Sequence, residues 1–330
     1  MSITSSLTQA FPPHPAFTEK DVPDLKDYVF AVTGASAGVG KELTRILYSK
    51  NAKVYMMARS EEKTNKAIAE ITQALPASRG SLVFIQLDLG DLSSIKATVD
   101  SFLSQEKKLH VLVNNAGIMS SEKKLVTTPQ GFEQHVGVNV LGPYLLTRLL
   151  TPTLIATAQV EPANKVRVVW LGSSASEMFA VKNVGATAEM MKIESLAKKS
   201  GNERYWYSKV GNWAHNAEYA LRYKAHGVVS VAANPGNLQS ELYRDQGLMM
   251  RAVTKLIMYP PVNGAYTELY AALSPDISLS NTGCWVIPFG RVYPIRQDLT
   301  NATKTESEGG SGGTRRFWDW SEEQVRPYLE

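Results

Sequence analysis

Tyr205 and Lys209 are four positions apart in a stretch, residues 205–223, whose pattern predicts a helix, so both side chains lie on one face. An ammonium group beside a phenol favours the phenolate and lowers the pKa of the phenol from ~10 toward neutrality. Tyr205 is therefore a candidate general acid/base. The spacing Y-x-x-x-K is common by chance, but here it follows a predicted strand, 166–171, that ends in the polar run 172–174, Gly-Ser-Ser.

A second candidate site is the glycine-rich stretch 33–40, Thr-Gly-Ala-Ser-Ala-Gly-Val-Gly, between a predicted strand and a predicted helix. Gly34 allows a tight turn, Gly38 leaves room for a pyrophosphate beside the backbone, and Gly40 allows close packing of helix on sheet. Free N–H groups at the helix start would face the phosphates. The spacing is G-x-x-x-G-x-G rather than G-x-G-x-x-G, so a turn that binds nothing remains the alternative at this point.

Strand and helix signals alternate from residue 25 onward, and the strands are apolar runs without polar alternation. This pattern predicts an α/β fold with a doubly wound parallel sheet flanked by helices on both faces. The predicted strands are 28–32, 52–58, 81–87, 109–113, 166–171, 228–232 and 284–287. The predicted helices are 41–50, 61–75, 91–107, 128–150, 205–223 and 263–273, with Pro129 in the first turn of the fourth.

The remaining segments differ in composition. Residues 1–24 are polar and Pro-rich, which predicts an arm on the surface of a single domain, 25–330. Residues 176–204 separate the fifth strand from the next helix and include a short predicted helix, 188–193. Residues 240–261 are rich in Leu, Ile and Met and follow the sixth strand, where open α/β sheets bind ligands, so we interpret them as a substrate lid rather than core. The tail, 306–330, combines a Gly/Ser linker, 306–313, with an aromatic segment, 316–329, that predicts a helix docked on the body.

Composition excludes several classes of protein. The net charge of +4 lacks the concentrated basic character of a nucleic-acid binder, so no nucleic-acid partner is expected. The single cysteine, Cys284, excludes an internal disulfide and fits a reducing compartment. No apolar run approaches the ~20 residues of a membrane span, and residues 1–15 lack a signal pattern. We expect a cytoplasmic protein without an integral membrane span, and no metal site.

Several motifs occur in order on matching elements: T-G-A-S-A-G-V-G from Thr33, N-N-A-G from Asn114, Asn139 within V-N-V, Ser174 before Y-x-x-x-K, and N-P-G from Asn234. With them the chain resembles a classical short-chain dehydrogenase/reductase over residues 25–290, close to the retinol-dehydrogenase-like branch found in fungi. The resemblance implies a Rossmann-like fold with a seven-stranded parallel sheet.

The resemblance also implies catalytic roles. Tyr205 would transfer a proton to or from the substrate oxygen, and Ser174 would hydrogen-bond that oxygen, with Ser173 the weaker candidate. Lys209 would hold the nicotinamide ribose and assist Tyr205. Asn139 would kink its helix and hold a water that links Lys209 to solvent.

The cofactor choice follows from the residues after the second strand, where an acid would select NAD. Arg59 stands there instead, and a guanidinium matches a 2′-phosphate, so the sequence favours NADP(H). The alternative is a solvated surface arginine, with Glu61 and Glu62 nearby. The cofactor-binding set implied by motif and resemblance is Gly34, Ser36, Gly38, Val39, Gly40, Arg59, Asp88, Leu89, Asn115, Ala116, Gly117, Tyr205, Lys209, Pro235, Gly236, Leu238 and Ser240. The family usually has Thr where Ser240 stands.

The first functional hypothesis is an NADP(H)-dependent oxidoreductase that interconverts a carbonyl and an alcohol on a lipophilic small molecule. The alternatives are a non-redox cyclase, isomerase or regulator on the same fold, and a scaffolding subunit that uses the aromatic tail. The interval from Ser174 to Tyr205 is longer than is usual in the family, so segment 176–204 would border the substrate mouth. The helices that contain Thr128 and Tyr205 resemble those of four-helix interfaces in the family, which predicts a homodimer or homotetramer.

Overall fold

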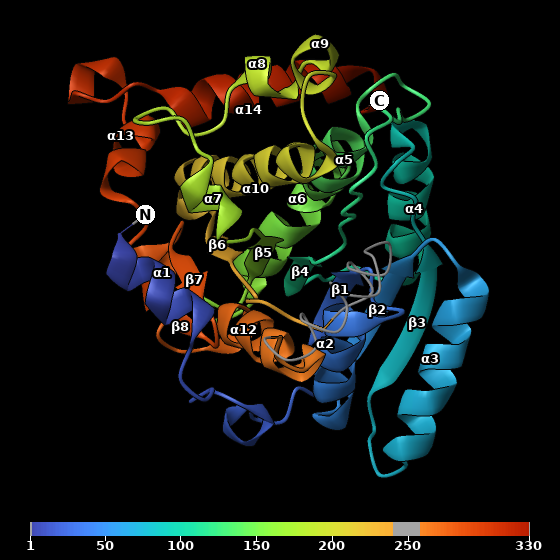
Figure 1. The fold of residues 1–330 in the computed structure, drawn as a ribbon. Helices are drawn as coiled ribbons and strands as arrows, with labels where there is room; N and C mark the ends of the chain where they lie inside the picture. Colours follow the sequence, from blue (N-terminus) through green and yellow to red (C-terminus); the bar gives the residue numbers. More distant parts are fainter. Residues whose placement is uncertain (1, 240–257, 330) are drawn as a thin grey trace.

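One mixed sheet forms the centre of the computed structural model, which describes residues 2–239 and 258–329. Its strand order is β3-β2-β1-β4-β5-β6-β7-β8, and every neighbouring pair is parallel except β7 and β8 (Figure 1). The strands are β1 (Val29–Thr33), β2 (Lys53–Ala58), β3 (Ser81–Gln86), β4 (Val111–Asn114), β5 (Arg167–Leu171), β6 (Val229–Ala233), β7 (Trp285–Ile287) and β8 (Arg291–Tyr293).

Helices cover both faces of the sheet, which confirms the predicted doubly wound α/β fold (Figure 1). One face carries α2 (Gly38–Ser49), α3 (Glu61–Ala74) and α12 (Pro261–Leu273), and the other carries α4 (Leu92–Gln105), α6 (Gly142–Val160) and α10 (Gly201–Tyr223). Alternate strand residues enter opposite cores: Phe30 and Val32 pack toward α2, whereas Val29 and Ala31 pack toward α4 and α6. This two-sided burial is why the strands appear as unbroken apolar runs.

The strand order reverses between β1 and β4, because β2 and β3 lie on one side of β1 and the later strands on the other. At such a reversal the loops from the carboxyl ends of the strands diverge and leave a crevice. The glycine-rich motif, N-N-A-G, Ser174 and N-P-G follow β1, β4, β5 and β6 at this edge, and helix α10 contains Tyr205 and Lys209. The topology therefore concentrates the predicted site residues in one place.

The sheet has one more strand than the seven expected. β8 runs antiparallel to β7, with Val286 opposite Val292, after a tight connection through residues 288–290. Three residues, none of them buried, give almost no periodic signal, so the sequence pattern did not predict this strand.

The helix expected over 128–150 begins later than predicted. Thr128 and Pro129 lie in a turn in which the Gly131 N–H donates to the Thr128 carbonyl at 2.9 Å, and Gly131 has a φ of +83°. The helix starts at α5 (Gln134–Val136), capped by the Glu133 carboxylate, and continues through a π-helical turn, Gly137–Leu141, into α6. Pro129 favours a helix start at this point, but the Glu133 cap and the left-handed Gly131 determine where the helix begins.

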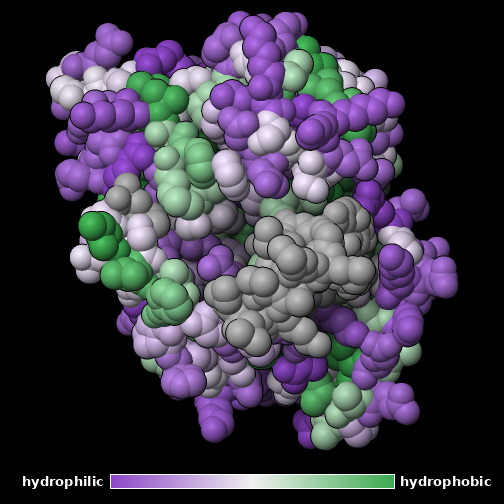
Figure 2. Space-filling model, in the orientation of Figure 1, coloured by the Kyte–Doolittle hydropathy of each residue, from purple (hydrophilic) through white to green (hydrophobic). Residues whose placement is uncertain are grey.

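The N-terminal arm contains a helix that was not predicted, α1 (Ile3–Ala10). Its inner face is polar: Gln9 is buried, its Nε2 donates to Glu177 at 2.7 Å, and its Oε1 accepts from Asn234 at 2.8 Å. Its outer face exposes Ile3, Leu7 and other apolar side chains, visible in green where α1 lies (Figure 2). A helix that buries its polar side inverts the usual amphipathic pattern, so composition alone suggested only a surface arm.

The C-terminal tail docks on the body as predicted. Helix α14 (Gly313–Val325) packs on α10 and α6, with Phe317 and Trp318 buried, and Glu322 receives hydrogen bonds from Tyr144 at 2.5 Å and from Arg148 at 2.9 Å. Residues 306–313, expected as a flexible linker, include a 3-10 turn. α14 therefore covers apolar positions of α6 and α10, the helices for which a four-helix interface was predicted. The side chains of Phe317 and Trp318 are buried against the body of the protein, so they are not available to a scaffold partner.

Segment 176–204 contains three short helices: the end of α7 (Ala175–Met178), α8 (Ala188–Met191) and α9 (Ile193–Leu196). The helix expected over 188–193 is thus divided into α8 and the start of α9. Of the predicted lid, 240–261, residues 240–257 lie outside the described residues, and Tyr259 pairs with Leu238 in a parallel bridge. None of the described helices is long and apolar enough to cross a membrane.

One buried acid generates a stability prediction. Glu268 in α12 is fully buried, and neither carboxyl oxygen has a hydrogen-bond partner among the described residues. Burial raises the pKa of this carboxyl well above its usual value, although the charge of Lys209 opposes the shift. The folded protein therefore keeps a proton that the unfolded chain loses above about pH 4.3, so stability falls as the pH rises.

We expect Glu268→Gln to raise the melting temperature by several degrees at neutral pH and to reduce this pH slope, because the amide never ionises. The melting temperature measured from pH 5 to pH 8 checks this. Glu323→Gln, at an exposed position in α14, is the control and should change neither quantity. A Glu268→Gln protein that is less stable at every pH would contradict the prediction.

Candidate active site

The glycine turn after β1 has the geometry of an anion cradle. Gly34 and Gly38 have φ of +68° and +56°, and a Cβ at Gly38 would meet nothing within 4 Å. A Cβ at Gly40 would approach Asn115 Nδ2 to 2.5 Å, so Gly40 is required for packing rather than for contact with a ligand. No side chain caps the start of α2 at Ala37, which leaves its first N–H groups available to a phosphate.

A cleft of about 550 Å³ lies along the carboxyl edge of the sheet and brings together most of the predicted site residues. Those that line it are Gly34, Ser36, Gly38, Val39, Arg59, Asp88, Leu89, Asn115, Ala116, Gly117, Ser173, Ser174, Tyr205, Lys209, Pro235, Gly236 and Leu238. Gly40 and Asn139 lie behind the lining, and Ser240 lies outside the described residues. The glycine turn, the uncapped helix and the cleft together fit a dinucleotide.

Lys209 is a buried polar group at the centre of the site. A capping box of Ser200 and Glu203 starts α10, so Tyr205 and Lys209 lie in its second and third turns. The ammonium donates to the Leu171 carbonyl at 2.9 Å and lies 5.7 Å from the centroid of the Tyr205 ring. Burial lowers the pKa of Lys209 to about 8. Lys209 is therefore held beside Tyr205 with a pKa close to neutral pH.

Asn139 lies in the π-helical turn and holds the loop after β4. Its Oδ1 accepts from the Ile118 N–H at 2.8 Å, and its Nδ2 donates to the Ile118 carbonyl at 3.0 Å and to Ser208 Oγ at 2.9 Å. The predicted irregularity of the helix at this residue takes the form of a π turn. These contacts join the β4 loop to α10 one residue from Lys209.

The end of the cleft beside β2 is basic. Arg59 is exposed at its rim, and Lys63, one turn into α3, lines the cleft beside it. Lys63 was not predicted, although its position four residues after Arg59 was a usable signal. Asp88 also reaches the cleft, and its Oδ1 accepts from the Gly90 N–H at 2.9 Å. Two cations at one rim can bind a phosphate monoester more strongly than one.

The opposite end of the cleft is mostly apolar. Met119, Met178 and Trp206 line it together with the amide of Asn202, and Phe179 stacks on Trp206 at 4.3 Å between ring centroids. These lining residues were not named from the sequence, because no short motif marks them. Met178 and Asn202 belong to segment 176–204, which the structure places at this part of the cleft.

The N-P-G turn after β6 closes the floor of the cleft. The Asn234 Oδ1 accepts from the Gly236 N–H at 3.1 Å, and Gly236 has a φ of +95°. The part of the chain that the structure describes contains no group of three or more His, Cys, Asp or Glu residues that could hold a metal ion. Taken together, the residues that line the cleft give it a polar centre, a basic end beside β2 and an apolar end opposite.

Comparisons with known proteins agree with this arrangement. A family model for short chain dehydrogenases matches residues 28–186. The chain is 48% identical to the short-chain dehydrogenase/reductase bet4 of Neocamarosporium betae over 329 aligned residues. This alignment covers 99% of this chain and 94% of that protein. It is 42% identical to the short-chain dehydrogenase/reductase pkfC of Emericella nidulans, over 96% of this chain and 98% of that one.

Solved structures show the same fold. An uncharacterised protein from Mycobacterium paratuberculosis has a TM-score of 0.65 and 26% identity, over 94% of this chain and 97% of that chain. An NADPH-bound carbonyl reductase from chicken fatty liver has a TM-score of 0.61 at 19% identity, over 82% of this chain and 99% of that one. The fold and cleft are those of a nucleotide-binding oxidoreductase. The chain belongs to the short-chain dehydrogenase/reductase family.

The pKa of Lys209 generates a prediction for the pH profile. Below about pH 8 the side chain is an ammonium, which would stabilise a phenolate on Tyr205, and above that pH it is neutral. We expect kcat/KM to fall as the pH rises through about 8. In Lys209→Arg the guanidinium stays charged, so the residual activity should not decline over the same range. If kcat/KM of Lys209→Arg falls with rising pH as it does in the unmodified protein, the fall is caused by the titration of another group.

Proposed function

We propose that this protein is an NADP(H)-dependent oxidoreductase that interconverts a carbonyl and an alcohol on a lipophilic small molecule. The observation that carries the proposal is that Ser174, Tyr205 and Lys209 all line one cleft, which also has a basic and an apolar end. Membership of the family supports the reaction class. The predictions of a cytoplasmic location and of a dimer or tetramer stay predictions, and α14 already covers part of the surface on which the latter was based.

In the direction of reduction, the Tyr205 hydroxyl gives its proton to the carbonyl oxygen as the carbonyl becomes an alcohol. The Ser174 hydroxyl donates a hydrogen bond to the same oxygen and fixes the orientation of the carbonyl group. Lys209 stabilises the phenolate that remains on Tyr205. The nicotinamide, when bound, supplies or accepts the hydride. The reverse sequence of proton transfers serves oxidation.

Arg59 and Lys63 support the choice of NADP(H), because both can meet a 2′-phosphate at the rim of the cleft. The apolar wall of Met119, Met178 and Trp206 supports a lipophilic substrate. The non-redox alternative predicts cofactor binding without oxidation of the nicotinamide. Absorbance of the reduced nicotinamide, followed with a panel of lipophilic aldehydes and ketones, distinguishes the two.

Tyr205→Phe tests the catalytic assignment. Removal of the hydroxyl deletes the proton donor, so we expect turnover to fall by about two to four orders of magnitude while the affinity for NADP(H) changes little. Tyr207→Phe, two residues further along the same helix, is the matched control and should keep normal turnover. Turnover of Tyr205→Phe close to that of the unmodified protein would remove Tyr205 from the mechanism.

Arg59→Ala tests the cofactor assignment. A charge-assisted contact contributes about 1.5–3 kcal/mol, so the dissociation constant for NADP(H) should rise by about one to two powers of ten. NAD(H) lacks the phosphate, and its dissociation constant should change far less. Calorimetry with both cofactors measures the split.

Two further variants sharpen this test. Arg59→Ala combined with Lys63→Ala should lose more affinity for NADP(H) than Arg59→Ala alone. Arg79→Ala, an exposed arginine at the start of β3 and so at the opposite edge of the sheet, should lose none. Equal weakening of both cofactors by Arg59→Ala would make Arg59 a surface residue and contradict the preference for NADP(H).

A further inference from the structure

Two side chains on one helical face hold the loop that follows β4. His135 and Asn139 are four residues apart, and they bind alternate residues of the loop: the Ser120 N–H donates to His135 Nε2 at 3.0 Å, and Asn139 binds both backbone groups of Ile118. Met119, whose side chain lines the apolar end of the cleft, lies between these two attachment points. Asn139 was predicted from the family motif, whereas His135 was not.

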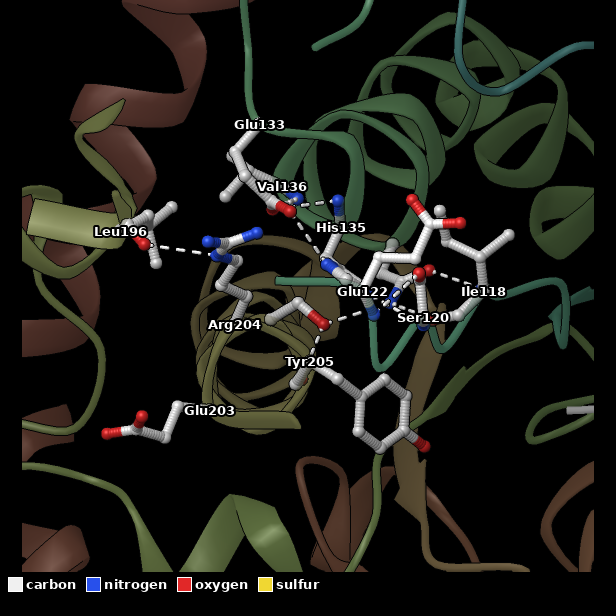
Figure 3. A network of polar contacts seen from close by, with 12 residues as sticks. Ile118, Ser120, Glu122, Glu133, His135, Val136, Leu196, Glu203, Arg204 and Tyr205 are labelled. Atoms are coloured by element: carbon white, nitrogen blue, oxygen red, sulfur yellow. Dashed lines mark hydrogen bonds and ion pairs between the residues drawn. The ribbon is translucent and has the colours of Figure 1, made fainter. Parts of the chain in front are cut away.

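The hydrogen bonds of His135 fix its tautomer. Because Ser120 donates to Nε2, this nitrogen carries no proton, and Nδ1 carries the proton and donates it to Glu133 Oε1 at 2.8 Å. Glu133 Oε2 accepts from the N–H groups of His135 and Val136 at 2.8 and 3.3 Å. Glu133 and His135 are both fully buried, with the imidazole between the carboxylate and Ser120 (Figure 3).

The same imidazole contacts Tyr205. The two rings are edge to face, with centroids 6.3 Å apart and an interplanar angle of 71°. The preceding residue, Arg204, is buried and donates to the carbonyl of Leu196 (Figure 3). It also donates to the carbonyls of Lys123 and Lys124, so α10 is tied to the far end of the β4 loop. His135 therefore lies where the loop that presents Met119 and the helix that presents Tyr205 meet.

We propose that Glu133 and His135 form a positioning pair for the reaction of this site. Glu133 fixes the imidazole as an acceptor toward Ser120, and the imidazole sets the place of Met119 against the substrate and of the Tyr205 ring. Neither residue lines the cleft, so the pair acts through its neighbours. This inference rests on the proposed oxidoreductase function for its kinetic readout.

The structure suggests a pair of substitutions with opposite expectations. In Glu133→Gln the amide oxygen still caps the helix, but the amide nitrogen cannot accept from Nδ1. The imidazole must then take the other tautomer, which directs an N–H of Nε2 at the N–H of Ser120. In His135→Gln the amide oxygen reaches close to the position of Nε2 and can still accept from Ser120. Glu133→Gln, although nearly isosteric, should therefore damage the site, whereas His135→Gln should be tolerated.

We expect Glu133→Gln to lower kcat/KM for the carbonyl substrate by about ten- to a hundredfold, the effect of leaving a buried hydrogen-bonding group unpaired. His135→Leu should lose at least as much, and His135→Gln should recover most of the activity. The dissociation constant for NADP(H) should stay within about twofold, because Thr33 independently holds Asn115 and Ala116 at 2.6 and 2.9 Å. Glu122→Gln, an exposed glutamate of the same loop, is the matched control and should match the unmodified protein.

Amide hydrogen exchange, followed by mass spectrometry, gives a readout that needs no turnover. Exchange of the loop, 117–124, should accelerate in Glu133→Gln and His135→Leu but not in His135→Gln or Glu122→Gln. If the unmodified protein reduces no carbonyl, the proposed function fails, yet this exchange pattern still tests the pair. Unchanged exchange and unchanged kcat/KM in Glu133→Gln would overturn the inference. So would a kinetic loss accompanied by an equal loss of cofactor affinity, because that would indicate general damage.

Discussion

A buried ammonium at the end of β5 is the interaction on which the rest of the site depends. The carbonyl of Leu171 accepts from Lys209 at 2.9 Å and from Asn212 at 2.8 Å, so two side chains of α10 converge on one acceptor. A buried cation without such a partner would cost several kcal/mol, which makes this position of α10 strongly preferred. Tyr205 is one helical turn before Lys209, so its place over the cleft follows from where the ammonium must lie.

Further polar contacts extend from this point and leave little freedom. Ser176 Oγ donates to the Lys209 carbonyl at 2.7 Å, which ties the start of α7, next to Ser174, to the same turn of α10. A Cβ added at Gly117 would lie 3.4 Å from Lys209 Nζ and 3.3 Å from Asn139 Oδ1, so the β4 loop passes as close as a glycine permits. The loops after β4 and β5 and helix α10 are thus mutually fixed, and a site built in this way is preorganised rather than assembled by its ligand.

The sequence predicted the regular half of this arrangement and not the irregular half. The glycine turn, the apolar strands and the spacing of Tyr205 and Lys209 are local signals, and local signals determine elements that each bury a continuous surface. α1 was missed because long-range contacts stabilise it, such as those of Gln9 with Glu177 and Asn234. β8 was missed because three residues give almost no periodic signal. The start at Gln134 was missed because the Glu133 cap and the turn at Gly131 were not recognised. His135 was missed because its position has meaning only once the loop after β4 is in place.

The two ends of the cleft differ in how they are built. The basic end consists of a turn between β1 and α2 and of residues directly after β2 and β4, where backbone geometry and few side chains decide the fit. The apolar end, to which we assign the substrate, consists of Met119, Met178, Asn202 and Trp206, which come from loops and helix starts held by buried side-chain contacts. A substitution among those buried contacts can move the apolar wall without disturbing the nucleotide turn. Selectivity for the substrate can therefore change through residues that never touch it, while the binding of the cofactor is retained.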